Sequence, residues 1–154
     1  TALRDLYVDN LIETGAAKYV WPFRVCQDDK RITLYYLIYA TNNFKGLDIM
    51  KGIMYNQNEY FAYLGPDEHV YQFSKNQLKL IDFNQENLKN YLLKTYSKAK
   101  KTYEQIKEET YMDTVCIDKH YRNALKELEK EKKITIKRVS SRTGLKGDDI
   151  ICFE

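Results

Sequence analysis

The feature of this chain that most constrains its fold is a change of periodicity near its carboxyl end. Over residues 118–131 the apolar side chains recur on one side of an α-helix, at about 100° per residue. They are Tyr121, Ala124, Leu125 and Leu128. Two short apolar runs follow at 134–139 and 149–154, separated by a basic segment that contains glycine. Because that segment is too long for a two-residue turn, the runs predict a β-hairpin with an extended loop.

Two further helices are predicted before this one. Asn84 is the expected N-cap of the first, whose apolar side chains share one face. Thr102 and Gln105 match a capping box, in which each side chain accepts a hydrogen bond from the other residue's backbone N–H, so a second helix is predicted to begin there. Asp118 is the expected cap of the third helix. Three helices followed by a hairpin with a basic loop is the layout of a winged helix, a variant of the helix-turn-helix.

The positive charge of the chain is concentrated in the same region. Residues 119–146 hold ten basic and three acidic side chains, a net charge of +7, although the whole chain carries only +3. On the third helix the basic side chains lie opposite the apolar ones, within roughly a 100° arc, and the glutamates lie on the flanks. The residues predicted to bind nucleic acid are Lys119, Arg122, Asn123, Lys126 and Lys130 on the helix and Lys137, Arg138, Arg142 and Lys146 on the loop.

This distribution of charge favours nucleic-acid binding, with duplex DNA as the expected partner. Lysine and arginine gain affinity by releasing the cations condensed on a phosphate backbone, and amide or guanidinium groups suit base edges in a major groove. Ser140 and Ser141 add donors for phosphate oxygens. Two alternatives stay open. The same surface could dock on a protein, or it could be a solvated face in which Lys126 and Glu129 form an ordinary neighbouring pair.

The amino-terminal part of the chain predicts a helix, an antiparallel hairpin and a second helix. Apolar residues recur at helical spacing over 3–11, and Gly15 stands where such a helix would end. Runs at 19–26 and 32–40 are rich in β-branched and aromatic residues, and the second is nearly continuous in apolar groups. A strand of that kind is expected to be covered on both faces inside a larger sheet. Residues 41–43 offer cap chemistry for the following helix.

The sequence contains no catalytic constellation and no cofactor or metal motif, so a non-enzymatic role is favoured for this chain. The cysteines stand far apart without a C-x-x-C pair, and the glycines never form G-x-G. The adjacent acids at 28–29 and 148–149 predict turns, and His120 is expected at the exposed start of the third helix, within reach of a phosphate. No apolar run is long enough to cross a membrane, so a cytoplasmic location is predicted.

Two stretches of the chain resemble a known family. The first spans 19–54 and contains YYLIYAT-N-x-x-K-G-x-x-x-M-K, and the second spans 117–154 and contains H-Y-R-x-A-L-K-x-L-E. Together they resemble the C-terminal half of the three-Cys-motif partner proteins, which are bacterial and phage-borne and are found beside a protein that carries the three-cysteine motif. The resemblance covers nearly the whole chain except 55–83.

The resemblance implies a methyltransferase-like domain of the Rossmann type followed by a winged helix. This chain lacks the family's glycine-rich segment after a strand, so it is expected to be the carboxyl-terminal part of such a protein, without a cofactor of its own. The predicted fold is α+β. It has the remnant of an α/β domain over 1–55, a variable hairpin or connector over 56–83, and a winged helix over 84–154.

The resemblance also supplies a partner and rival functions. The three-Cys-motif protein encoded nearby is the candidate for protein docking. Alternatively, the chain is the accessory half of a methyltransferase-like enzyme whose cofactor site lies upstream. Strand edges left free by an incomplete sheet are expected to pair with another copy of the chain.

Overall fold

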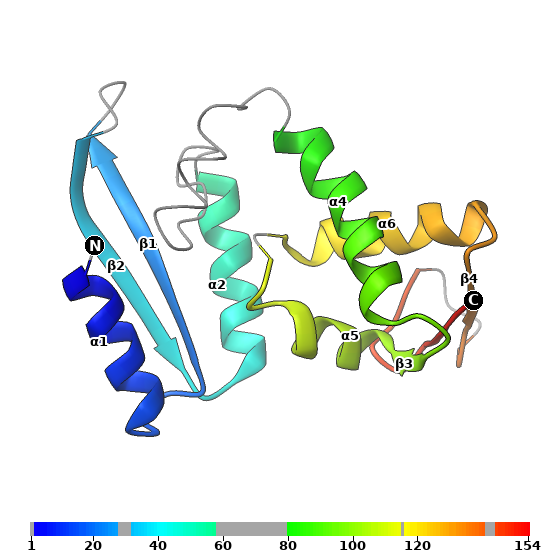
Figure 1. Cartoon of the computed structure of the whole chain (residues 1–154), viewed down its shortest axis with the longest axis horizontal. Coiled ribbons are helices and arrows are strands. Elements are labelled where there is room, and N and C mark those ends of the chain that lie inside the picture. Colours follow the sequence, from blue (N-terminus) through cyan, green and yellow to red (C-terminus); the bar gives the residue numbers. More distant parts are fainter. Residues whose placement is uncertain (1, 28–31, 58–79, 115, 141–143) are drawn as a thin grey trace. The chain divides into compact units, whose positions relative to one another are not determined.

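The computed structural model describes residues 2–27, 32–57, 80–114, 116–140 and 144–154. The chain divides into two compact units, Thr1–Gln77 and Leu78–Glu154, which are described separately (Figure 1). Helices and antiparallel strands occur in both units, which confirms the predicted α+β class. The hairpin predicted within 56–83 and the turn predicted at 28–29 lie outside the described residues.

The elements of the first unit follow the predicted order. They are α1 (Ala2–Glu13), β1 (Tyr19–Gln27), β2 (Ile32–Thr41) and α2 (Phe44–Gln57). Gly15 follows α1 with a φ of +70°, the left-handed conformation in which glycine commonly ends a helix. The Asn43 Oδ1 atom accepts a hydrogen bond from the Lys45 N–H at 2.8 Å, so the predicted cap of α2 is confirmed.

The β1–β2 hairpin carries a helix on each of its two faces. Trp21 lies opposite Tyr39 in the antiparallel pair, and the Lys51 ammonium of α2 is 4.2 Å from the centroid of the Trp21 ring. Because successive side chains point to opposite faces, Tyr36 lies on the other face, where the Arg4 guanidinium of α1 is 5.0 Å from the centroid of its ring. Figure 1 shows α1 and α2 on the two sides of the hairpin.

Within the described chain, part of one face of β2 is open, and its cover inside a larger sheet stays a prediction. The side chains of Tyr35 and Leu37 are 57% and 41% exposed. Phe23, which lies opposite Leu37 on β1, is 0% exposed, so the same face of the sheet is buried along β1. The apolar run of β2 therefore reflects strand propensity, and it does not report burial of these two side chains within the described chain.

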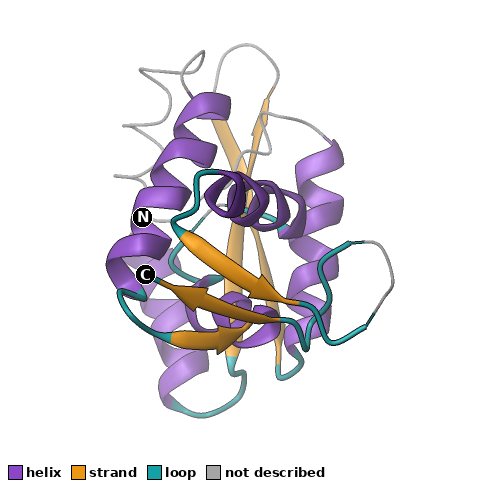
Figure 2. Ribbon diagram, turned by 90° about the vertical axis from the view of Figure 1, so that its right-hand side faces the viewer, coloured by secondary structure: helices purple, strands orange, loops and turns teal. Residues whose placement is uncertain are grey.

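The second unit has the topology of a winged helix. Its elements are α4 (Leu80–Thr95), β3 (Lys100–Thr102), α5 (Tyr103–Thr110), α6 (Asp118–Lys130), β4 (Ile134–Lys137) and β5 (Ile150–Phe153). The strands form an antiparallel sheet in the order β3-β5-β4, seen as adjacent arrows in Figure 2. The predicted hairpin is thus confirmed, and residues 138–149, which join its strands, are called the β4–β5 loop.

The predicted cap chemistry holds at α5 and fails at the two other helices. The Thr102 Oγ1 atom accepts from the Gln105 N–H at 3.2 Å, and the Gln105 Oε1 atom accepts from the Thr102 N–H at 3.0 Å, which confirms the capping box. The prediction that Asn84 caps α4 is wrong, because the helix begins four residues earlier. Asp118 is also not a cap. It is the first residue of α6 after the N-cap Ile117, and its carboxylate is bound by cations instead.

The short strand β3 has no counterpart among the predicted elements. Its three residues include two lysines, so it shows no apolar alternation. Backbone pairing with β5 defines it, with Lys101 opposite Ile151. The Lys101 ammonium is 2.7 Å from a carboxylate oxygen of Glu109 on α5, which gives the exposed side of the strand a partner.

Candidate nucleic-acid interface

α6 is fixed in the second unit by the apolar face that its spacing predicted. Its side chains that are 0% exposed are Tyr121, Ala124, Leu125 and Leu128. The Tyr121 hydroxyl lies 3.0 Å from the Thr110 Oγ1 atom and 2.8 Å from the Thr114 Oγ1 atom. Burial raises the pKa of Tyr121, so this hydroxyl stays neutral among its partners. Because this side of α6 faces the core, its opposite side faces solvent.

The three glutamates near the end of α6 are all engaged by cations of the same unit. On the side that faces α4, the Lys89 ammonium is 3.3 Å from a Glu127 carboxylate oxygen and 2.9 Å from one of Glu131. On the side that faces the β4–β5 loop, the Glu129 carboxylate accepts hydrogen bonds from the Arg138 guanidinium at 2.7 and 3.0 Å. These three glutamates, which would otherwise repel a polyanion, are therefore paired and lie on the flanks of the helix.

Three lysines occupy the outermost side of α6 and are called the outer lysines below. They are Lys119, Lys126 and Lys130. At about 100° per residue they fall within roughly 40° of one another, opposite the buried face. All three are exposed, and their ammonium groups meet no carboxylate among the residues that the structure describes. Asn123 is half-buried and lies about 40° from the centre of this row.

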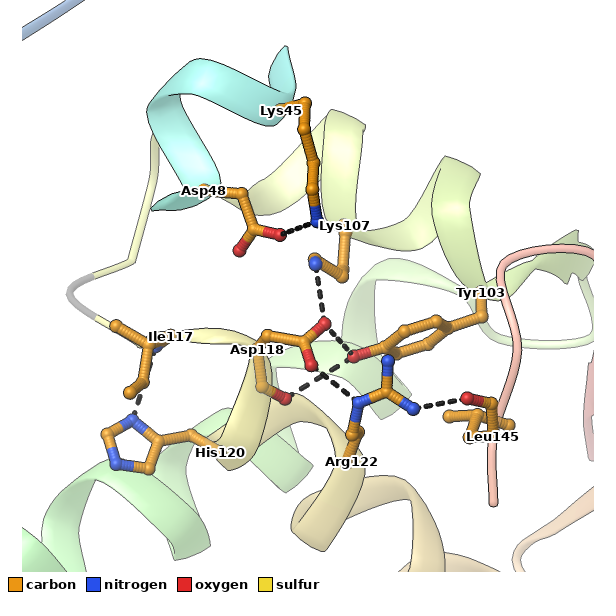
Figure 3. Close-up of polar contacts among 9 residues, drawn as sticks. All are labelled: Lys45, Asp48, Tyr103, Lys107, Ile117, Asp118, His120, Arg122 and Leu145. Atoms are coloured by element: carbon orange, nitrogen blue, oxygen red, sulfur yellow. Dashed lines mark hydrogen bonds and ion pairs between the residues drawn. The ribbon is translucent and has the colours of Figure 1, made fainter. Parts of the chain in front are cut away.

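Arg122 joins a polar cluster at the start of α6 (Figure 3). Its Nε atom donates to the Asp118 Oδ2 atom at 2.5 Å, and its Nη1 atom donates to the carbonyl oxygen of Leu145 in the β4–β5 loop. The guanidinium carbon lies 5.0 Å from the centroid of the Tyr103 ring. Arg122 thus connects α6 to both α5 and the loop.

Asp118 is the centre of this cluster. Besides the bond from Arg122, its Oδ1 atom accepts from the Lys107 ammonium at 2.5 Å and from the Tyr103 hydroxyl at 2.7 Å. Burial raises the pKa of the carboxyl, but the donors outweigh burial and lower the pKa of Asp118 to about 2. The Lys107 side chain is only 7% exposed and also lies near the rings of Tyr103 and Tyr111. Such a partner stabilises a buried ammonium, because burying an unpaired charge is costly.

The base of the β4–β5 loop is fixed by Asp149, which is 1% exposed. Its carboxylate accepts hydrogen bonds from the Val139 N–H at 2.9 Å and the Lys146 N–H at 2.7 Å, and so ties the two limbs of the loop together. Its carbonyl oxygen accepts from the N–H of Tyr103, the first residue of α5, at 2.9 Å. The turn predicted around 148–149 is confirmed, and it holds the loop in place.

Comparison with known proteins agrees with this topology. Residues 71–141 match the family model of the GMT-like wHTH domain. The chain contains a winged-helix domain of the GMT-like type. No curated protein and no solved structure matches the chain. In this domain α6 is the second helix of the helix-turn-helix, and the β4–β5 loop is the wing.

The winged-helix domain exposes some of the predicted binding residues and engages others in internal contacts. Those that are exposed and form no ion pair with a described residue are the outer lysines together with Lys137 and Lys146. Arg122 and Arg138 both form ion pairs, and their side chains are 37% and 45% exposed. Arg142 and Ser141 lie outside the described residues. The lysines thus make up the freely presented positive charge of this surface in the described part of the chain.

The structure differs from the prediction for the exposure of His120, and it adds two residues, Lys107 and Asp118, that the sequence did not assign to the site. His120 is 8% exposed, and its Nδ1 atom accepts from the Ile117 N–H at 3.3 Å, so the prediction that it is exposed is wrong. Lys107 and Asp118 were not predicted as part of the site. A signal existed for Asp118, which precedes Arg122 by four positions, the spacing of a helical ion pair. No periodicity marks Lys107 as buried.

In the described part of the chain, no cluster of histidine, cysteine, aspartate and glutamate side chains could hold a metal ion. Neither Cys116 nor Cys152 forms a disulfide bond within the described part of the chain. None of the described helices combines the length and the apolar content that a membrane span requires.

Proposed function

We propose that the chain binds nucleic acid, with duplex DNA as the expected form, through α6 and the β4–β5 loop. The observation that carries the proposal is the row of outer lysines, which are exposed and have no carboxylate partner among the described residues. The neighbouring glutamates are paired with Lys89 and Arg138 instead. Such a row attracts a phosphate backbone because binding releases condensed cations. In helix-turn-helix proteins the second helix is the one that enters the major groove.

The side chains of this surface take different roles in the proposal. The outer lysines neutralise phosphates along the groove, and Lys137 and Lys146 hold phosphates beside the loop. Asn123 lies next to the outer lysines, and its amide can make two hydrogen bonds to an adenine edge. Arg138 is not expected to contact the duplex when the duplex first binds, because its guanidinium is bound to the Glu129 carboxylate.

Duplex binding by the full chain is expected to depend steeply on salt. With five lysine–phosphate contacts, a plot of the logarithm of the association constant against the logarithm of the salt concentration has a slope of about −4.5. Between 50 and 200 mM salt, the affinity then falls about 500-fold. Fluorescence anisotropy of a labelled DNA duplex measures this slope, and an RNA duplex of the same sequence tests the preference for DNA. Absence of binding at low salt, or a slope near zero, contradicts the proposal.

The resemblance to three-Cys-motif partner proteins supports a wider setting for this module. In that setting the chain is a cytoplasmic protein of bacterial or phage origin, and its first unit is the end of a methyltransferase-like domain. The open side chains of Tyr35 and Leu37 on β2 are compatible with cover by further structure. Association with the three-Cys-motif protein that does not change with salt would favour docking over nucleic-acid binding. A glycine-rich strand-to-helix turn encoded upstream would favour the enzymatic setting.

We also propose that β2 pairs with β2 of a second copy of the chain. Ile32–Thr41 contains no charged residue, and among the described strands β1 is its only neighbour, so its other edge offers free backbone groups. Leu37→Lys is expected to convert a dimer to a monomer in size-exclusion chromatography with light scattering. Asn10→Lys, at an exposed position of α1, is the control and keeps the dimer. A monomeric wild-type chain at micromolar concentration contradicts this pairing.

A further inference from the structure

We infer that Arg122 is a positioning residue of the proposed interface, which sets the β4–β5 loop relative to α6 and does not itself contact nucleic acid. This inference rests on the proposed function and changes the role that the sequence suggested for Arg122. At about 100° per residue, Arg122 lies roughly 60° from the centre of the outer lysines, on the side of α6 that faces the loop.

The guanidinium of Arg122 is held from three directions. The Asp118 carboxylate accepts from its Nε atom, the Leu145 carbonyl oxygen accepts from its Nη1 atom, and the Tyr103 ring lies 5.0 Å away. A guanidinium is planar and its donors form a rigid fork, so two bonds and one ring contact fix its orientation. These contacts direct the guanidinium towards α5 and the β4–β5 loop.

The bond to Leu145 completes a regular set of contacts along one limb of the loop. The carbonyl oxygens of Leu145, Gly147 and Asp149 all accept hydrogen bonds from outside the loop. For Gly147 and Asp149 the donors are the backbone N–H groups of Glu104 and Tyr103 at the start of α5, at 3.0 and 2.9 Å. For Leu145 the donor is a side chain of α6. Of these three bonds, the one from Arg122 is therefore the one that ties the limb to α6.

This bond determines where the loop presents its positive charge. Leu145 is 4% exposed and lies between Gly144, whose φ is +95°, and Lys146, which is exposed. Fixing the carbonyl of Leu145 fixes the backbone from which Lys146 projects. The spacing between Lys146 and the outer lysines decides whether both can meet phosphates of one duplex, so Arg122 acts on binding through the loop.

Amide hydrogen exchange of the full chain tests the structural part of the inference without any nucleic acid. Arg122→Gln removes the charge, and Arg122→Lys keeps it but lacks the fork that reaches both Asp118 and Leu145. Both variants are expected to speed exchange at residues 144–147 about ten-fold and to leave exchange in β4 unchanged. Unchanged exchange at 144–147 in both variants overturns the inference.

A double-mutant cycle on duplex affinity tests the functional part. In the wild-type background, Arg122→Gln and Arg122→Lys are each expected to weaken binding about ten-fold. In a background that carries Lys137→Gln and Lys146→Gln, the same changes are expected to weaken binding less than three-fold, because the two lysines that hold phosphates beside the loop are then absent. Wild-type affinity in Arg122→Lys, or a loss of three-fold or more in the second background, overturns the inference. If the wild type binds no duplex, the proposed function fails, while hydrogen exchange still decides whether Arg122 positions the loop.

Discussion

Replacement of the three outer lysines with glutamine is expected to weaken duplex binding about 500-fold at 0.1 M salt. Each lysine–phosphate contact contributes about 1.2 kcal/mol at this salt concentration through the release of condensed cations. Because Lys119, Lys126 and Lys130 are exposed, the change removes charge without removing buried contacts. The salt slope should also become shallower by about 2.7. Anisotropy titrations at several salt concentrations measure both effects.

A matched variant on the same domain separates the position of these charges from their number. Lys94, Lys98 and Lys100 are exposed and lie outside α6 and the β4–β5 loop. Glutamine at 94 and 100 and asparagine at 98 remove the same charge. Asparagine is chosen because Lys98 has a φ of 58°, a conformation that asparagine tolerates. This control is expected to keep affinity within about three-fold of wild type. Equal losses in the two variants would mean that total charge, and not the row on α6, governs binding.

The ion pairs of α6 bear on the alternative that its basic face is an ordinary solvated surface without a binding role. In that case Lys126 and Glu129 would be expected to pair as helical neighbours, but Glu129 is bound to Arg138. Exposed pairs of this kind contribute at most about 1 kcal/mol, so packing of the loop and α4 can readily decide which partner each glutamate takes. The result is a helix whose glutamates are bound by cations of neighbouring elements and whose outer lysines have no carboxylate partner among the described residues.

The sequence predicted those parts of the winged-helix domain that depend on helical spacing or on local hydrogen-bond chemistry. The burial of Tyr121, Ala124, Leu125 and Leu128 follows from helical spacing, and the capping box at Thr102 follows from local hydrogen-bond chemistry. β3 could not be predicted in the same way, because backbone pairing with a distant strand creates it. The apolar run of β2 indicated a strand correctly, but it could not indicate that Tyr35 and Leu37 are exposed.

The same distinction, between what local spacing determines and what packing determines, applies to the candidate site. The outer lysines were predicted because opposite faces of a helix can be read from spacing. The engagement of Arg122 by Leu145 joins residues 23 positions apart, and that of Lys107 by Asp118 joins residues 11 positions apart. Such contacts depend on how α5, α6 and the loop pack. The sequence therefore gives the charge of a basic side chain. Whether that charge is available to a partner depends on packing, which only the structure gives.

Asp118→Asn is expected to lower the free energy of unfolding of the second unit by about 3 kcal/mol. The substitution leaves the Lys107 ammonium, only 7% exposed, without its carboxylate, and it removes the acceptor of the Arg122 Nε atom. The value lies at the lower end for a broken buried pair because the Asp118 side chain is itself 32% exposed. Hydrogen exchange of α6 amides in the full chain measures the change. Asp148→Asn, at an exposed site, is the control and is expected to change stability by less than about 0.5 kcal/mol.

The dependence of this effect on pH and on Lys107 separates a charge contribution from loss of packing. The pKa of Asp118 is about 2 in the folded chain, below its ordinary 3.8, so the ionised carboxylate stabilises the fold above about pH 4. That contribution, about 1–2 kcal/mol after allowance for solvent screening, is lost as the pH falls from 4 towards 2. Asp118→Asn should lack this loss. Adding Lys107→Met should recover about 1 kcal/mol or more, because no buried ammonium is then left unpaired. If the double variant is less stable than Asp118→Asn alone, Lys107 stabilises the domain through its packing, and the charge argument for Asp118 is wrong.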